Sequence, residues 1–165
     1  MSESWNDLTE GKVLGEVSLD VSETSVILVP VATWDLFPGH HSPEYARSQG
    51  QQDMYLNTIA LQGVADRTVT DHLGPDAWVT RRKLTMLGSV FPGDQLAGAA
   101  TVDAVRRSEP EVEADFTVEM STPRGPALRA TITARRYFTP SPPRPSPPPT
   151  VSGPPAAGHP QKGQP

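Results

Sequence analysis

The sequence predicts an α+β fold, with one long helix packed on an antiparallel sheet in a single domain. Residues 53–75 carry apolar side chains at helical spacing and form the one long helical candidate in the chain. Residues 112–120 alternate strictly between apolar and polar side chains, and residues 127–138 repeat the alternation after a turn at 121–126. A helix and an amphipathic sheet each need a second layer over their apolar face, so the two patterns together indicate a two-layer core.

The segment before the long helix predicts a strand, a loop and a short helix. Residues 25–34 are rich in β-branched side chains and predict a strand, with Pro30 marking an edge or a bulge. A loop follows. Residues 42–49 then predict a short helix, because Ser42 is a suitable N-cap and Pro43 suits the first helical position.

The long helix and the strands after it have recognisable ends. Asp53 is expected to cap the helix, and Gly74 with Pro75 to stop it. A turn of sequence FPGD separates the first two strands. The four strands expected after the helix cover residues 78–90, 95–105, 112–120 and 127–138.

One folded domain is expected to occupy residues 10–138 of the 165-residue chain, after a flexible N-terminus at residues 1–9. Residues 139–165 hold 11 of the 19 prolines and no aromatic residue. Such a segment cannot bury enough apolar surface to offset the entropy of ordering. It is therefore expected to be a disordered, Pro-rich tail.

Charge and composition argue against several classes of protein. The net charge of −5 disfavours a nucleic-acid partner, which would need a basic face. The chain has no cysteine, which excludes disulfides, thiolate metal sites and cysteine nucleophiles. No apolar run approaches the ~20 residues of a membrane span, and the N-terminus lacks the basic and apolar regions of a signal peptide. A cytoplasmic location, without a membrane partner, is therefore expected.

The stretch WDLFPGHHSPEYA, residues 34–46, concentrates the residues with the most chemistry. Asp35 and His40 both lie in it, and a carboxylate beside an imidazole is suited to proton transfer near neutral pH. Either residue alone has a simpler explanation, since Asp35 can stabilise a turn and His40 can be an ordinary surface histidine. His41 is expected to be structural. A metal site that joins His72 to these residues is conceivable but lacks any recognised ligand spacing.

The same stretch resembles the active-site loop of the MaoC-like family of (R)-specific enoyl-CoA hydratases and dehydratases, which adopt the hotdog fold. That loop reads Asp-x-Asn-Pro-x-His in the family and DLFPGH here, with Phe37 in place of the asparagine. The turn FPGD, residues 91–94, matches a second hallmark of the family. The stretches DLFPGHH and ARSQGQQDMYLN are similar to the small subunits of two-component enoyl-CoA hydratases from actinobacterial steroid side-chain degradation. Similar small proteins occur in polyketide pathways.

The resemblance implies an enzyme that reversibly hydrates or dehydrates an α,β-unsaturated acyl thioester, carried by coenzyme A or by an acyl-carrier protein. Asp35 and His40 would be its acid–base pair, and the backbone N–H of Asn57 would stabilise the thioester oxyanion. No metal or other cofactor is implied. The family also implies a homodimer, or a heteromer with a second hotdog subunit. The other residues expected at the substrate site are Phe37, Tyr55 and Leu56.

Two alternatives remain open at the level of sequence. The same fold and the same pair would serve a cyclase that adds a substrate hydroxyl intramolecularly, as in an oxa-Michael addition. The second alternative is a non-catalytic hotdog subunit that completes a partner's site. Phe37 favours these alternatives, as does Leu56–Asn57, which stands where the family has His-Gly. The intact pair of Asp35 and His40 favours catalysis.

Overall fold

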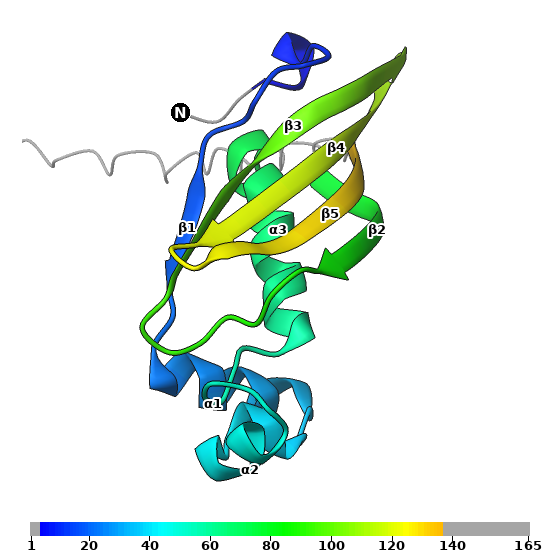
Figure 1. Ribbon diagram of the computed structural model, residues 1–165. Helices are drawn as coiled ribbons and strands as arrows, with labels where there is room; N and C mark the ends of the chain where they lie inside the picture. The colour runs from blue at the N-terminus through cyan, green and yellow to red at the C-terminus, as the bar shows by residue number, and fades with distance from the viewer. Residues whose placement is uncertain (1–3, 137–165) are drawn as a thin grey trace, which may run out of the picture.

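The computed structural model describes residues 4–136, which form a five-stranded antiparallel sheet with one long helix against it (Figure 1). The strands lie in the order β1-β3-β4-β5-β2, so β1 and β2 form the two edges. The predicted arrangement of a long helix on an antiparallel sheet is confirmed. The expected Pro-rich tail, residues 139–165, lies outside the described residues. The strands are β1 Val17–Asp20, β2 Ala77–Met86, β3 Gln95–Ser108, β4 Glu111–Thr122 and β5 Gly125–Arg136.

Helix α3, Thr58–Leu73, is the layer that covers the sheet. The prediction that this helix starts at Asp53 is wrong, because its N-cap is Asn57. The Asn57 side-chain oxygen accepts a hydrogen bond from the N–H of Ala60 at 2.9 Å, which satisfies a donor of the first helical turn. Gly74, at φ 88°, ends the helix as expected. The buried residues of α3 are Leu61, Val64, Ala65, Thr68, Val69 and Leu73.

Strands β4 and β5 show the alternation that the sequence predicts. Phe116 of β4 pairs with Ile132 of β5, and both side chains are buried under α3. Val118, Met120 and Leu128 extend this buried face. The expected strand at 78–90 is shorter than predicted and ends at Met86, whereas the expected strand at 95–105 continues to Ser108.

The N-terminal residues differ from the expectation of a flexible segment. A short 3₁₀ turn, η1 at Trp5–Asp7, places Trp5 and Leu8 in the main hydrophobic core, where they are 3% and 2% exposed. The Arg107 guanidinium holds this segment by donating hydrogen bonds to the carbonyl oxygens of Trp5 at 3.1 Å and Leu8 at 2.9 Å. The sequence analysis also missed β1, the edge strand that pairs with β3.

The predicted strand at 25–34 is wrong, because Glu23–Thr33 forms helix α1. Ser22 and Ser25 form a capping box in which each side chain bonds the other residue's backbone N–H. Pro30 lies inside the helix. Only Val26 and Pro30 of α1 are buried, so most of its apolar side chains face outward. No helix among residues 4–136 is long and apolar enough to span a membrane.

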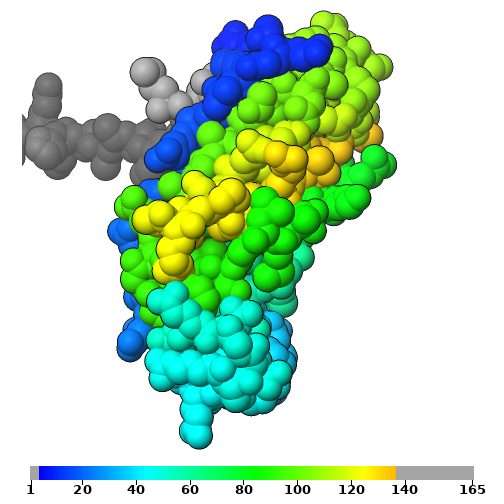
Figure 2. Space-filling model, viewed as in Figure 1, coloured from blue at the N-terminus to red at the C-terminus, as the bar shows by residue number. Residues whose placement is uncertain are grey.

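Helix α2, Pro43–Ser48, is confirmed with the predicted start, since the Ser42 hydroxyl accepts from the N–H of Tyr45. Helices α1 and α2 lie together at one end of the molecule, beyond the sheet (Figure 1). In the space-filling view this end is the blue and cyan lobe at the bottom (Figure 2). The loop between the two helices therefore lies near the N-terminal end of α3.

Candidate active site

The loop that carries DLFPGHH connects two helices, rather than a strand and a helix. Trp34 ends α1 in a left-handed conformation at φ 55°. A 3₁₀ turn, η2 at Pro38–His40, then reverses the chain before α2 begins. This tight turn brings the side chain of His40 back toward Asp35, five residues earlier.

Asp35 and His40 meet at this turn. Nε2 of His40 lies 3.4 Å from Oδ2 of Asp35. His40 is buried, while the Asp35 side chain is 31% exposed, so one partner is fixed in the protein and the other is open to a ligand. The pair predicted from the sequence is therefore brought together in space.

The backbone of Tyr55 sets the tautomer of His40. Nδ1 of His40 lies 2.8 Å from the carbonyl oxygen of Tyr55, and a carbonyl oxygen can only accept a hydrogen bond. Nδ1 therefore carries a proton, and Nε2 is the nitrogen that faces Asp35. A neutral imidazole would then set its Nε2 lone pair against a carboxylate oxygen. The two side chains are consequently suited to hold one further proton between them.

Asn57 brings the start of α3 to the same carboxylate. Its Nδ2 lies 3.1 Å from Oδ2 of Asp35 and 3.1 Å from the hydroxyl oxygen of Thr33. The residue is fully buried. Its backbone N–H, the expected oxyanion donor, has no acceptor among residues 4–136. The amide side chain is a feature of the site that the sequence analysis missed, although the N-cap preference of asparagine was an available signal.

Aromatic rings surround His40. The ring of Phe37 meets His40 edge-on at a centroid distance of 5.5 Å and meets Tyr45 at 5.6 Å. The ring of Tyr55 meets the other side of His40 at 5.0 Å. Gly39 is needed here, because a Cβ at this position would lie 2.6 Å from a ring carbon of Phe37. Phe37 and Tyr55 thus both lie against His40.

Leu56 lies in the hydrophobic core rather than against the Asp35–His40 pair. Its side chain is 1% exposed and belongs to the main core, and its N–H donates to the carbonyl oxygen of Val90 at 2.8 Å. Neither group is open to a ligand. Leu56 therefore supports the start of α3 from inside the fold.

His41 and His72, the other histidines among the described residues, do not share a site with the pair. Nε2 of His41 contacts the carbonyl oxygen of Leu36 at 3.3 Å. His72 lies in the last turn of α3 and packs against Gly15, so the length of the helix separates it from Asn57. Within residues 4–136, no group of three or more His, Asp or Glu side chains is placed to hold a metal ion.

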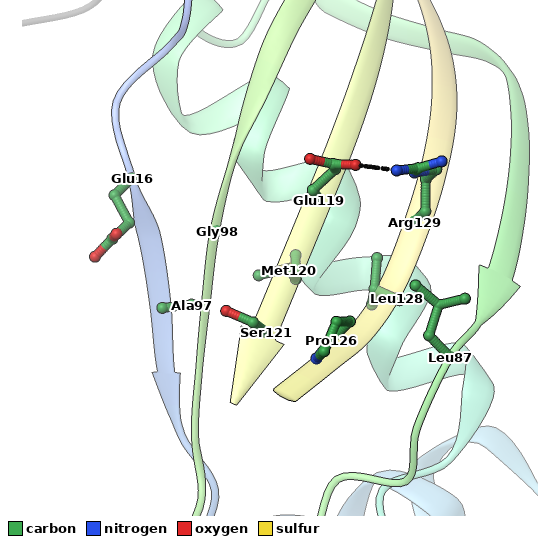
Figure 3. Close-up of a pocket in the computed structure, with 10 residues that line it drawn as sticks. All are labelled: Glu16, Leu87, Ala97, Gly98, Glu119, Met120, Ser121, Pro126, Leu128 and Arg129. Atoms are coloured by element: carbon green, nitrogen blue, oxygen red, sulfur yellow. Dashed lines mark hydrogen bonds and ion pairs between the residues drawn. The ribbon is translucent and has the colours of Figure 1, made fainter. Parts of the chain in front are cut away.

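A separate hollow of about 390 Å³ lies on the face of the sheet that points away from α3 (Figure 3). Gly98 is essential to it, because a Cβ there would lie 2.1 Å from the carbonyl oxygen of Glu119 on β4. Glu119 of β4 and Arg129 of β5 lie side by side at the hollow in an ion pair (Figure 3). The lining holds no histidine, and because Glu119 is neutralised by Arg129, Glu16 is left without a second acid–base group beside it, so the hollow is a poor candidate for acid–base chemistry.

Known proteins resemble this chain in both sequence and fold, although no protein-family model matches it. The 3-oxo-4,17-pregnadiene-20-carboxyl-CoA hydratase beta subunit of Mycobacterium tuberculosis is 30% identical over 123 residues, which are 67% of this chain and 94% of that protein. The ChsH1–ChsH2 complex from the same organism contains a chain with a TM-score of 0.72 and 26% identity, covering 78% of this chain and 98% of its own length. A MaoC-like dehydratase from Rhodospirillum rubrum has a TM-score of 0.70 and 18% identity, with coverages of 82% and 97%.

These likenesses agree with the family that the sequence resembles. The structural neighbours confirm the predicted hotdog fold. The 30% identity with the hydratase beta subunit extends over nearly all of that protein. The chain therefore belongs to the MaoC-like hotdog family of hydratases and dehydratases.

Proposed function

We propose that this chain reversibly hydrates an α,β-unsaturated acyl-CoA thioester, with Asp35 and His40 as the acid–base pair. The observation that carries the proposal is the 3.4 Å approach of His40 Nε2 to Asp35 Oδ2 beside the start of α3. A CoA thioester is favoured over a carrier-protein thioester because the relative in Mycobacterium tuberculosis bears the name of a CoA-ester hydratase.

The protons of the reaction have defined places on this pair. In hydration, the Asp35 carboxylate takes a proton from water as the water oxygen attacks the β-carbon. Nε2 of protonated His40 gives its proton to the α-carbon, so that water is added across the double bond. The Asp35 carboxyl then returns its proton to Nε2 of His40, and the resting pair is restored. Dehydration runs through the same steps in reverse.

The start of α3 supports the charge that develops on the thioester oxygen. The backbone N–H of Asn57 has no acceptor among the described residues and belongs to the positive end of a 16-residue helix. A donor that is already in place stabilises a developing oxyanion at little reorganisation cost. The ring of Tyr55 packs edge-on against His40 and would contact the acyl group.

A second hotdog subunit is proposed to close the site. Several large apolar side chains are exposed on elements that meet near the pair, and we call them the apolar rim. Trp34 and Leu36, which flank Asp35, are 84% and 59% exposed. A cluster of this kind marks an interaction surface. The neighbour from Mycobacterium tuberculosis is a complex of two named proteins, which makes a different hotdog chain a reasonable alternative to a second copy. The apolar rim consists of Leu28, Val31, Trp34, Leu36, Ile59, Met86 and Leu87.

Isotope labelling tests the proposed reaction and separates it from the alternatives. The chain, alone and with each candidate hotdog partner, is incubated with crotonyl-CoA and longer enoyl-CoA esters in H₂¹⁸O. Hydration gives a product with one labelled oxygen at the β-position. A cyclase acting on a substrate with an internal hydroxyl gives a product of unchanged mass without label. No turnover of any enoyl ester, alone or with a partner, contradicts the hydratase.

A further inference from the structure

The side chain of Asn57 makes more contacts than a helix cap needs. Its oxygen accepts from Ala60 N–H, and its nitrogen reaches Thr33 and Asp35, each at 3.1 Å. No part of the residue is exposed. A capping asparagine needs only its oxygen for the helix. The two contacts of Nδ2 therefore call for a separate explanation.

The orientation of this amide is fixed by its partners. Ala60 offers an N–H, so the amide atom that meets it must be the oxygen. The Thr33 hydroxyl donates its own hydrogen to the carbonyl oxygen of Val29 at 2.8 Å, which leaves a lone pair to accept from Asn57. The second hydrogen of Nδ2 then points at Oδ2 of Asp35. The oxygen and each of the two N–H hydrogens of the amide thus have one partner each.

This contact distinguishes the two oxygens of Asp35. Oδ2 accepts from Asn57 and faces His40, whereas Oδ1 has no hydrogen-bond partner among residues 4–136. Oδ1 is therefore the oxygen available to a ligand. A hydrogen bond from an N–H to a carboxylate is stronger than one between neutral groups, so this contact also restrains the rotation of the carboxylate.

We infer that Asn57 is a positioning residue that holds Oδ2 of Asp35 toward His40 and so aims Oδ1 of Asp35 at the nucleophile. The inference rests on the proposed function for the identity of that nucleophile. The groups around the carboxylate come from three elements: neutral Asn57 from the start of α3, neutral Thr33 behind it from the end of α1, and titratable His40 from η2.

Two substitutions separate the amide's contact with Asp35 from its role as a cap. Asn57→Ser keeps a cap oxygen of similar preference but removes the NH₂ donor. Asn57→Asp keeps the size and the cap and replaces the donor by a second carboxylate. Asn57→Ser is expected to melt within a few degrees of the wild type, whereas Asn57→Asp is expected to melt lower, because it buries a second carboxylate beside Asp35. Thr33→Val is the matched control, because it removes the other partner of Nδ2 and leaves the Asp35 contact in place.

The first measurement requires no catalytic turnover. The carboxyl of Asp35 is followed by ¹³C NMR at neutral pH and is assigned by comparison with Asp35→Asn. Its chemical shift is expected to move in Asn57→Ser and in Asn57→Asp, which both lose the N–H donor, and to stay in place in Thr33→Val. An unmoved chemical shift in both Asn57 variants overturns the inference.

The second readout is hydration of an enoyl-CoA ester by the full chain, with its partner if one is required. Asn57→Ser is expected to lower kcat about 10- to 100-fold, as for a lost hydrogen bond to a charged group, with KM little changed. A loss confined to KM would mean that Asn57 does not position the reacting carboxylate. If the NMR signal moves but the wild type hydrates no enoyl ester, the proposed function fails while the role of Asn57 in positioning Asp35 stands.

Discussion

Nδ1 of His40 donates a hydrogen bond to the carbonyl oxygen of Tyr55 at 2.8 Å, across 15 residues of sequence. A backbone carbonyl is a fixed acceptor, so this bond fixes both the ring plane and the tautomer of His40. Nε2 is left as the single nitrogen that can exchange a proton with Asp35 or with a substrate. The acid–base pair therefore depends on the backbone just before α3 as well as on the loop.

Loss of either member of the pair is expected to lower turnover about 10²- to 10⁴-fold, the usual contribution of a positioned acid or base. The variants are Asp35→Asn and His40→Ala, and kcat for an enoyl-CoA ester is the measured quantity. Because the two groups share one proton, the double variant should be little worse than either single variant. Single losses that multiply fully in the double variant would contradict a shared proton.

His41 is the internal control for this experiment. It is adjacent to His40 in sequence, but its ring contacts the carbonyl oxygen of Leu36 and lies outside the pair. His41→Ala should therefore reduce turnover by less than about tenfold, or ~1.4 kcal/mol in the barrier. A loss as large as that of His40→Ala would shift the acid–base role to His41.

A methyl group at Gly39 is expected to disturb the site without unfolding the protein. In Gly39→Ala the new Cβ would meet the ring of Phe37 at 2.6 Å. Phe37 is exposed enough to move, and the movement takes its ring away from His40. We expect kcat/KM to fall about tenfold, with a melting temperature close to the wild type.

Gly63→Ala is the matched substitution for this test. Gly63 lies inside α3, and a Cβ there would have no neighbour within 4 Å. Alanine is favoured over glycine in a helix by ~1 kcal/mol. This variant should melt at the same or a higher temperature and retain full activity. Equal activity of the Gly39 and Gly63 variants would show that the contact of Phe37 with His40 is unimportant.

The sequence was sufficient to predict those parts of the fold that depend on a regular pattern. The side chains around Phe116 repeat with the period of a strand, and those around Leu61 repeat with the period of a helix. Both residues lie in the hydrophobic core. Helix α1 was mistaken for a strand because its run of β-branched residues favours extended structure. The capping box of Ser22 and Ser25, a local signal for a helix start, pointed the other way.

The candidate site was predictable only where its residues lie close together in the sequence. Asp35 and His40 lie close in sequence, so their spacing was informative. Asn57 is 22 residues from Asp35, and nothing in the local pattern places its amide on that carboxylate. Phe37 stands where the loop of the family has an asparagine, so the sequence indicates that an amide is missing there. In the structure, an amide reaches the same loop from α3.

The buried N-terminal segment gives a prediction for stability. Trp5 is 3% exposed and packs in the main core. Trp5→Ala should lower the free energy of unfolding by ~3–5 kcal/mol, the usual cost of removing a large buried aromatic side chain. Asn6→Ala is the neighbouring control, since Asn6 is exposed, and should change it by less than ~0.5 kcal/mol. Denaturant titration measures both. A Trp5 variant as stable as the control would mean that the segment is not part of the core.

The outer face of the sheet gives a prediction for pH. Hydrogen bonds from Arg106 lower the pKa of both Glu113 and Asp115, with contacts of 2.8 and 2.7 Å. A carboxyl whose pKa is lowered by folding stabilises the protein above its unfolded pKa, near 4. That contribution is lost as the pH falls through the folded value.

Arg106→Gln should therefore lower the melting temperature at pH 7 by a few degrees at most, because Arg106 is half-exposed and solvent screens the interaction. The difference from the wild type should shrink as the pH falls below about 4. Arg129→Gln is the control on the same face, since its partner Glu119 is even more exposed. A difference between Arg106→Gln and the wild type that is constant from pH 3 to 7 would exclude a charge-based cause.

The apolar rim gives the last prediction, which concerns assembly. The Thr58 hydroxyl contacts the sulfur of Met86 at 3.3 Å, so the start of α3 adjoins the end of the edge strand β2. A second hotdog chain that pairs along β2 would cover Met86 and Ile59 and bring its own surface to the Asp35–His40 pair. Light scattering at micromolar concentration should therefore give a mass above that of a monomer, for the chain alone or with its partner.

Met86→Glu and Ile59→Glu would bury a charge in that interface, so each should shift the mass toward the monomer and reduce activity together with it. Val13→Glu is the matched control. Val13 is more exposed than either residue, yet it bridges to Thr101 on β3 at the β1 side of the sheet, away from β2. It should leave both mass and activity unchanged. A fully active monomer in all three variants would mean that one chain holds the complete site.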